Sequence, residues 1–230
     1  MTDAHCHAAR GESRHFLCDP RAGGEAGPDD VVFRGCHPWS AATFDAGRLR
    51  AALEADPRLG VGEIGLDRLK DKNISPAMRR VFETQLEIAA SFGRPVVLHG
   101  AKCWGEVVKA AKRYAGAIPA FLFHGFSRSA GLLGEIEAMN GFVSVGPALL
   151  NDHAVNYREL AKSIPERMLL AESDAGEDPA APRVAEVARR LARLRGADPA
   201  VFAEILESNA ARFAGALAAP SARLHPDCAV

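Results

Sequence analysis

The sequence predicts an α/β protein folded as a TIM-type (β/α) barrel whose first βα units are abbreviated. Short runs rich in Val, Ile, Leu and Phe alternate with longer segments of helical period, which is the pattern of βα units repeated around a parallel sheet. Eight such runs are present, the number of strands in this kind of barrel. The chain has 230 residues, a length that one such barrel commonly fills alone.

The predicted strands are short, mainly apolar segments bounded by turn residues. Only seven residues separate the first two, and residues 20–30, which are rich in Gly, Pro and Asp, have no periodicity. We therefore expect the first crossovers to lack helices. In chain order the strands are "TDAHCH" (2–7), "HFLCD" (15–19), "VVFRGCH" (31–37), "LGVGEIG" (59–65), "PVVLHG" (95–100), "AFLFHGF" (120–126), "GFVSVG" (141–146) and "RMLLAESD" (167–174).

The clearest predicted helix spans residues 76–92. Pro76 follows Ser75 at a first-turn position, apolar side chains recur on one face, and Gly93 ends the pattern. We expect a last pair of helices to close the bottom of the barrel, so that residues 1–217 form a single domain and 218–230 a loose tail. The remaining predicted helices are 40–55, 103–115, 129–140, 152–163, 180–195 and 199–207.

Composition and charge exclude several classes of protein. The chain is 48% hydrophobic and 25% charged, which is ordinary for a globular protein with a sizeable core. Its formal net charge of −1 provides no global basic field, so a nucleic-acid substrate would have to be held by a local patch or by metal ions. No apolar run approaches the ~20 residues of a membrane span and no signal-peptide pattern is present, so we expect a cytoplasmic protein without membrane contacts. The five cysteines have no C-x-x-C spacing, which argues against a disulfide framework and a zinc ribbon.

Most of the predicted strands end in a side chain that can bind a metal ion. In a parallel barrel all carboxyl ends of the strands open onto one face, so residues that are distant in the chain meet at one mouth. Any one of them alone could be a satisfied structural residue, but buried together without partners they would cost ~1–3 kcal/mol each. These residues are His5, His7, His37, Glu63, His99, His124 and Asp174.

The number of these ligands favours two ions over one. A catalytic zinc usually takes three protein ligands and leaves one position for water. A carboxylate can bridge two ions, so we expect Glu63 to lie between two sites. One site would be built from His5, His7 and Asp174, and the other from His99 and His124.

The motifs resemble those of a known group, the TatD-like metal-dependent hydrolases of the amidohydrolase type. In the order of that family, "DAHCH" is similar to its D-x-H-x-H element, "GCHPW" to its G-x-H-P segment, "VGEIGLD" to the strand with the bridging glutamate and "RPVVLHG" to its P-V-x-x-H strand. Further on, "HGFS" resembles the H-x-F-S-G element, "LLAESDAG" the L-x-E-T-D element and "NAARFAG" the closing helix. The resemblance extends from residue 2 to about 213.

The resemblance implies a ligand set and an activity. The implied metal ligands are His5, His7, Glu63, His99, His124 and Asp174, with none substituted. The implied activity is hydrolysis of phosphodiester bonds, as by a deoxyribonuclease or an exonuclease trimming DNA or RNA, with two divalent ions such as zinc, magnesium or manganese. Asp174 would also orient the attacking water as a general base, Glu63 would bridge the ions, and Glu172 would support a ligand histidine.

This chain departs from the family pattern at the rim of the mouth. The segment between "DAHCH" and "GCHPW" is shorter than in better-known members, which suggests a compact subgroup. Lys102, in "HGAKCW", stands near the position of an expected arginine, and Arg128 replaces the glycine expected after "HGFS". Both could bind substrate phosphate, or be solvated side chains at helix starts. His37 and Trp39 could line the pocket, with Trp39 stacking on a base or packing at the rim.

Two other functions stay open at this level. The same metal pair could hydrolyse carbon–nitrogen bonds or lactones, since fold and ligands alone do not select the substrate. A glutamate in place of a bridging lysine and the family resemblance favour a nucleic acid or small phosphodiester substrate. A third possibility is a non-catalytic metal-binding barrel. Neither the native metal nor the oligomeric state can be predicted, because imidazole and carboxylate ligands suit several divalent metals.

Overall fold

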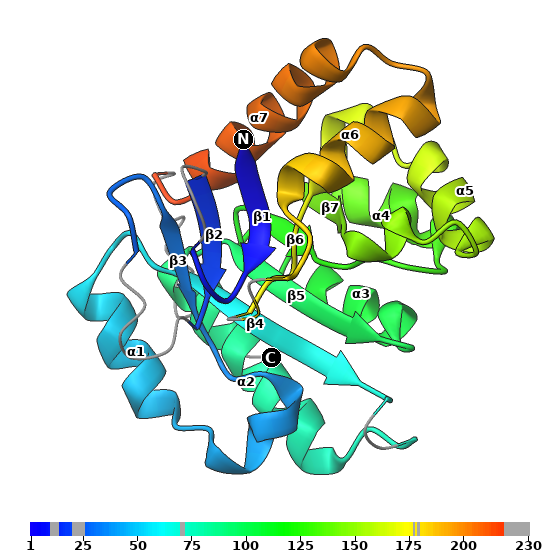
Figure 1. Ribbon diagram of the computed structural model, residues 1–230. Coiled ribbons are helices and arrows are strands. Elements are labelled where there is room, and N and C mark those ends of the chain that lie inside the picture. The colour runs from blue at the N-terminus through cyan, green and yellow to red at the C-terminus, as the bar shows by residue number, and fades with distance from the viewer. Residues whose placement is uncertain (10–13, 20–25, 70–71, 177, 179, 219–230) are drawn as a thin grey trace.

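Eight parallel strands form one sheet in the order of the sequence, β1 to β8 (Figure 1). The computed structural model describes residues 1–9, 14–19, 26–69, 72–176, 178 and 180–218. The segment after β8 pairs with β1, because Asp174 N–H donates to the carbonyl of His5 and His7 N–H to that of Ala175. This pairing brings the two ends of the sheet together and confirms the predicted TIM-type barrel. The strands are β1 (Thr2–Cys6), β2 (Arg14–Cys18), β3 (Val31–Arg34), β4 (Gly60–Asp67), β5 (Val96–Ala101), β6 (Phe121–Phe123), β7 (Gly141–Val145) and β8 (Leu169–Ala171).

Helix α2 (Pro76–Phe92) has the predicted bounds, and the other helices agree with the predicted segments but differ at one or both ends. The predicted helix 40–55 is divided, because the Asp45 carboxylate accepts from Arg48 N–H and starts a new helix there. The last predicted helix continues eight residues further, to Gly215. The α-helices are α1 (Ala46–Ala55), α2 (Pro76–Phe92), α3 (Trp104–Lys112), α4 (Leu133–Ala138), α5 (Val155–Ser163), α6 (Val184–Arg195) and α7 (Pro199–Gly215), and the 3-10 helices are η1 (Pro38–Thr43), η2 (Ala130–Leu132), η3 (Pro147–Leu150) and η4 (Glu166–Met168).

The first βα units are abbreviated, as expected. Within the described parts of the β1–β2 and β2–β3 connections there is no helix. The first helical segment, η1, follows β3. Apart from residue 218, the predicted loose tail lies outside the described residues, so the division into domain and tail stays a prediction.

Helix α7 closes the end of the barrel at which the strands begin (Figure 1). The fully buried ring of Phe213 lies 5.4 Å from that of Phe16, 5.9 Å from that of Phe33 and 5.6 Å from that of Phe142, measured between centroids. The buried Asn209 side chain donates to the carbonyls of Glu166 and Leu169 and fixes α7 against the last strand. With this end filled by aromatic side chains, the open end is the opposite one, where the strands terminate.

No helix in the described part of the chain is both long enough and apolar enough to cross a membrane.

Candidate metal centre

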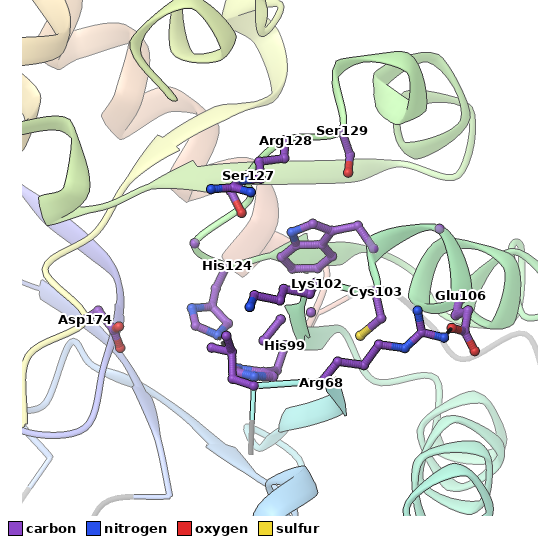
Figure 2. A pocket seen from close by; sticks show the side chains of 16 residues that line it. Arg68, His99, Lys102, Cys103, Glu106, His124, Ser127, Arg128, Ser129 and Asp174 are labelled. Carbon is purple, nitrogen blue, oxygen red and sulfur yellow. Dashed lines mark hydrogen bonds and ion pairs between the residues drawn. The ribbon is translucent and has the colours of Figure 1, made fainter. Parts of the chain in front are cut away.

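The carboxyl ends of the strands bring the six predicted ligands together at the mouth of the barrel. Figure 2 shows three of them, His99, His124 and Asp174, around one space. The ligands come from both ends of the chain and its middle: His5 from β1 and His7 just after it, Glu63 from β4, His99 from β5, His124 just after β6, and Asp174 after β8.

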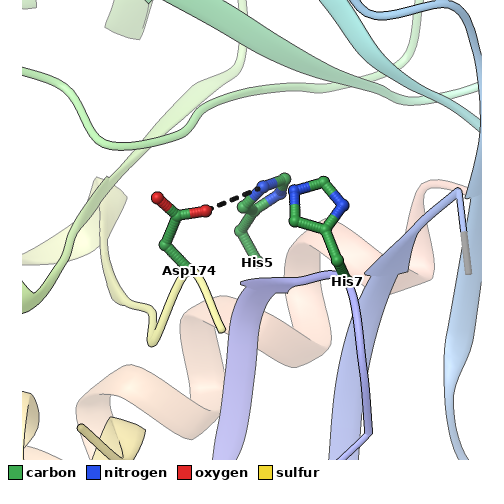
Figure 3. A group of neighbouring side chains, drawn as sticks. All are labelled: His5, His7 and Asp174. Carbon is green, nitrogen blue, oxygen red and sulfur yellow. Dashed lines mark ion pairs between the residues drawn. The ribbon is translucent and has the colours of Figure 1, made fainter. Parts of the chain in front are cut away.

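The first group consists of His5, His7 and Asp174, whose nearest ligand atoms all lie within 4.8 Å of one another (Figure 3). His5 Nε2 lies 3.6 Å from Asp174 Oδ1. His7 Nδ1 lies 2.9 Å from the carbonyl oxygen of Cys18, and since a carbonyl only accepts, this nitrogen carries the proton. The lone pair of His7 is therefore on Nε2, which faces the centre.

The second group is formed by Glu63, His99 and His124. Glu63 Oε1 lies 2.5 Å from His99 Nδ1 and 2.6 Å from His124 Nε2. The other oxygen, Oε2, lies 3.5 Å from Nε2 of both His5 and His7. One carboxylate thus faces both groups, one oxygen to each.

Close approach of β4 and β5 sets this arrangement. A Cβ at Gly65 would lie 2.0 Å from the carbonyl oxygen of His99, so only glycine allows the two strands to run so near each other here. Glu63 and His99, on these neighbouring strands, are thereby held at contact distance.

Burial and mutual charge perturb the pKa values of the centre. Burial, and then the neighbouring His124, hold the pKa of His5 well below its ordinary value. Burial also disfavours the charged forms of Glu63 and His124, but the attraction between these two opposite charges is the larger effect. The pKa of Glu63 is therefore well below its ordinary value and that of His124 well above. Burial raises the pKa of Asp174 to about 6, although one side of this carboxylate faces solvent.

The residues fit a bound cation. Both ring nitrogens of the fully buried His5 lack a hydrogen-bond partner among the described residues, although two carboxylate oxygens lie 3.5 and 3.6 Å from Nε2. A buried imidazole nitrogen without a partner is costly, and a divalent ion between these atoms would satisfy Nε2. The donor set of imidazole nitrogens and carboxylate oxygens suits zinc, manganese and similar divalent metals.

Glu172 lies behind His124, on the side of the ring away from Glu63. Its Oε1 is 3.6 Å from His124 Nδ1, and Ser144 Oγ donates to its Oε2 at 2.5 Å. Asp3 has a comparable place behind the first group, where it accepts from the backbone and hydroxyl of Ser173. Burial raises the pKa of Asp3 to about 6.

The sequence reasoning missed two carboxylates at the mouth. Asp67 is fully buried and accepts from His99 Nε2 at 3.0 Å. It is four residues after Glu63, a spacing that places both on the same side of a strand, and this signal could have found it. Asp19 directly follows β2, so the rule that selected the ligands at the strand ends, applied to "HFLCD", would have included it. Asp19 borders a cavity with His7 and His37.

The predicted substrate-binding residues fall into two cavities that share His99, His124 and Asp174. Lys102 and Arg128 line a cavity of about 800 Å³ (Figure 2). His37 lines the other, of about 510 Å³, with Trp39, whose side chain is 54% exposed and whose ring meets that of His37 edge-on.

A hydrogen-bond pair from α2 holds the loop that carries His37. The buried Gln85 side chain accepts from Cys36 N–H at 2.6 Å and donates to the Cys36 carbonyl at 3.1 Å. Burial lowers the pKa of His37 to about 4, which keeps this imidazole neutral near pH 7.

The sequence of this barrel matches a family model over most of its length. The model describes TatD related DNase, and it matches residues 25–215. The chain belongs to this TatD family. The family resemblance seen in the motifs is therefore confirmed, and the candidate metal centre lies in a TatD-family barrel.

Several TatD relatives are nucleases by name. The 3'-5' ssDNA/RNA exonuclease TatD of Citrobacter rodentium is 26% identical over 198 residues, 79% of this chain and 75% of that protein. The human 3'-5' RNA nuclease TATDN2 is 29% identical over 172 residues, 69% of this chain but 23% of that protein. The uncharacterized metal-dependent hydrolase YabD of Bacillus subtilis is 27% identical over 143 residues, 61% of this chain and 56% of that protein.

Solved TatD structures share the fold. YjjV, a TatD homologue from Escherichia coli, superposes with a TM-score of 0.73 at 21% identity, covering 92% of this chain and 96% of that one. A hydrolase of the TatD family from Entamoeba histolytica gives 0.72 at 12% identity, covering 92% and 97%. At these identities the likeness concerns the fold alone.

Proposed function

We propose that this TatD-family hydrolase cleaves phosphodiester bonds at the 3' ends of single-stranded DNA or RNA, using two divalent cations. The observation that carries the proposal is the position of Glu63, whose Oε1 faces His99 and His124 and whose Oε2 faces His5 and His7. The nuclease names of the TatD relatives support the choice of substrate and direction.

The proposed ligands form two sets, one for each cation, with Glu63 shared between them. His5, His7 and Asp174 would hold one cation, His99 and His124 the other, and Glu63 both. Bound cations would supply a water of lowered pKa and neutralise charge that develops on the phosphoryl oxygens. Zinc, manganese and magnesium are the metals to test first.

Asp174 is the proposed general base. Its carboxylate is half exposed, with 52% of the side chain accessible, whereas the other acidic ligand, Glu63, is buried. A water bound beside Asp174 can therefore come from solvent and donate a hydrogen bond to the free carboxylate oxygen. Glu172 would hold the ring of His124 in place from behind.

The charges around the mouth favour a phosphodiester over a neutral amide or lactone. Lys102 and Arg128 line the cavity next to His99 and His124, and neither has an acidic partner among the described residues. A neutral amide or lactone would give the positive charges of Lys102 and Arg128 nothing to bind. A nucleic-acid backbone carries negative charges that these two side chains complement.

The proposal can be tested with protein freed of metal by a chelator and reloaded separately with zinc, manganese or magnesium. We expect two cations per chain and stepwise shortening of a 5'-labelled single-stranded oligonucleotide from its 3' end. The same preparations should leave a panel of small lactones and amides intact. His99→Ala, which removes a proposed ligand, is the control. Activity that survives this substitution, or hydrolysis of lactones or amides alone, would refute the proposal.

A further inference from the structure

The cavity of about 800 Å³ beside His99 and His124 carries two cationic side chains without partners. Lys102 directly follows β5, and Arg128 lies five residues after the end of β6. Both side chains are exposed and line the cavity. Neither makes an ion pair or hydrogen bond within the described part of the chain. In Figure 2 the ammonium end of Lys102 points toward His124, and Arg128 lies beside Ser127 on the opposite side of the cavity.

The acidic side chain on the outer wall of this cavity does not cancel these charges. Glu106 forms ion pairs with both Arg68 and Arg79. It is therefore neutralised by neighbours other than Lys102 and Arg128. Asp174, at the inner end, belongs to the proposed metal ligands.

Both cationic residues have a left-handed backbone. The φ angle is 58° at Lys102 and 61° at Arg128, a conformation that costs residues with a Cβ about 1 kcal/mol or more relative to glycine. Five described non-glycine residues have a positive φ, and four of them, Asp19, Lys102, Arg128 and Asp174, lie at the mouth. Unfavourable backbone angles that gather around a site point to a role of these side chains in binding.

The amino terminus of α3 adds a third feature that attracts anions. Cys103, the N-cap residue, makes no capping bond with its side chain, because its Sγ donates to the carbonyl of Leu66 instead. The first-turn residues Trp104 and Gly105 line the cavity. Backbone N–H groups without a side-chain cap, together with the helix dipole, favour a phosphate at this position.

We propose that this cavity binds the phosphate on the 5' side of the scissile one, held by Lys102, Arg128 and the first turn of α3. The inference rests on the proposed function and names its substrate class more narrowly. When the 3'-terminal nucleotide is removed, the rest of the strand extends in the 5' direction, and its nearest phosphate needs a binding site. The natural substrate therefore has at least two phosphates, as an oligonucleotide does and a small phosphodiester does not. The volume of the cavity is in the range that holds a nucleotide-sized ligand.

Three short thymidine substrates test this directly with the metal-loaded enzyme. TpT has only the scissile phosphate, pTpT has a second one on its 5' side, and TpTp has it on its 3' side. We expect kcat/KM for pTpT to exceed that for TpT by about tenfold or more, since charge-assisted contacts to one phosphate are worth that factor. TpTp should gain no such advantage.

Variants separate binding from folding. Arg128→Gly and Lys102→Gly introduce glycine, the residue that the left-handed backbone at these two positions favours. The thermal midpoints of both variants should therefore equal or exceed that of the wild type. Both should lower kcat/KM for pTpT by a larger factor than that for TpT, so that the preference for pTpT shrinks toward one. Lys109→Ala removes an exposed charge from α3 outside the cavity and should preserve the preference for pTpT.

Failure of this inference differs from failure of the proposed function. Equal efficiencies on TpT and pTpT, a preference for TpTp, or variants that slow both substrates alike would overturn the second phosphate site alone. If no oligonucleotide or dinucleotide is cleaved with any cation, the proposed function itself is wrong.

Discussion

The Nε2 atom of His99 lies 3.0 Å from Oδ2 of Asp67, on the side of the ring opposite the atom that faces Glu63. Asp67 is fully buried, and its other oxygen accepts from Leu69 N–H. An ionised carboxylate only accepts, so the shared proton belongs to His99 Nε2. The atom left to bind the proposed cation is then Nδ1, from which the cation would displace the proton that it shares with Glu63.

Replacing Asp67 by Asn should weaken cation binding by about 10- to 100-fold, because the amide can donate to Nε2 and favour the wrong tautomer. Competition with a chromophoric chelator measures the affinity. Thermal unfolding of the metal-free variant checks that the fold is intact. Asp29→Asn, at an exposed acid away from the mouth, is the matched control and should bind as the wild type does. An affinity for Asp67→Asn within twofold of the wild type would rule out this role.

Addition of a divalent cation should stabilise the fold. Cation binding to the native state alone stabilises by about 2.7 kcal/mol when the cation is present at 100 times its Kd. The thermal midpoint should rise on titration with zinc or manganese and fall again with excess chelator. Glu63→Gln keeps the shape of the central side chain but removes its charge, so its midpoint should respond less. A wild-type midpoint that is insensitive to every cation would speak against the proposed centre.

Local signals predicted some elements in full. Helix α2 begins and ends as expected, since Ser75 caps it, Pro76 opens it and Gly93 takes the left-handed conformation after its end. The meeting of His5 with Asp174 could also be predicted, because it follows from closing a barrel and needs no knowledge of side-chain packing.

Tertiary contacts account for what the sequence reasoning missed. Nothing near Asp67 in the sequence indicates that His99, 32 residues later, donates to it. Nor does the pattern of α7 indicate that Phe213 meets three rings from β2, β3 and β7. Whether the six residues act as metal ligands stays a prediction for the experiments above.

The stability of the metal-free protein should depend on pH through Asp3. Burial raises the pKa of its carboxyl from 3.8 to about 6, so the native state holds the proton more tightly than the unfolded chain. This contribution favours folding at pH 4 and is lost as the pH rises through 6. Asn at this position can keep both contacts with Ser173 without carrying a charge.

The stability of Asp3→Asn relative to wild type should therefore increase by about 2–3 kcal/mol between pH 4 and pH 7. Urea unfolding of both metal-free proteins at the two pH values gives this difference. Using the difference cancels the titration of groups that the two proteins share. A constant difference across this range would show that burial does not perturb Asp3 as described.

The aromatic closure at the base of the barrel should contribute to stability and not to chemistry. Phe213 is fully buried among Phe16, Phe33 and Phe142. Phe213→Ala should cost about 3–5 kcal/mol of unfolding free energy, through lost burial and the cavity left behind. Val201→Ala truncates a side chain on the same helix that is 57% exposed, and should change stability by less than about 0.5 kcal/mol. Because α7 lies at the opposite end from the metal centre, the folded fraction of Phe213→Ala should keep its cation affinity. A weakened cation affinity together with unchanged stability would mean that α7 acts on the mouth and not on the core.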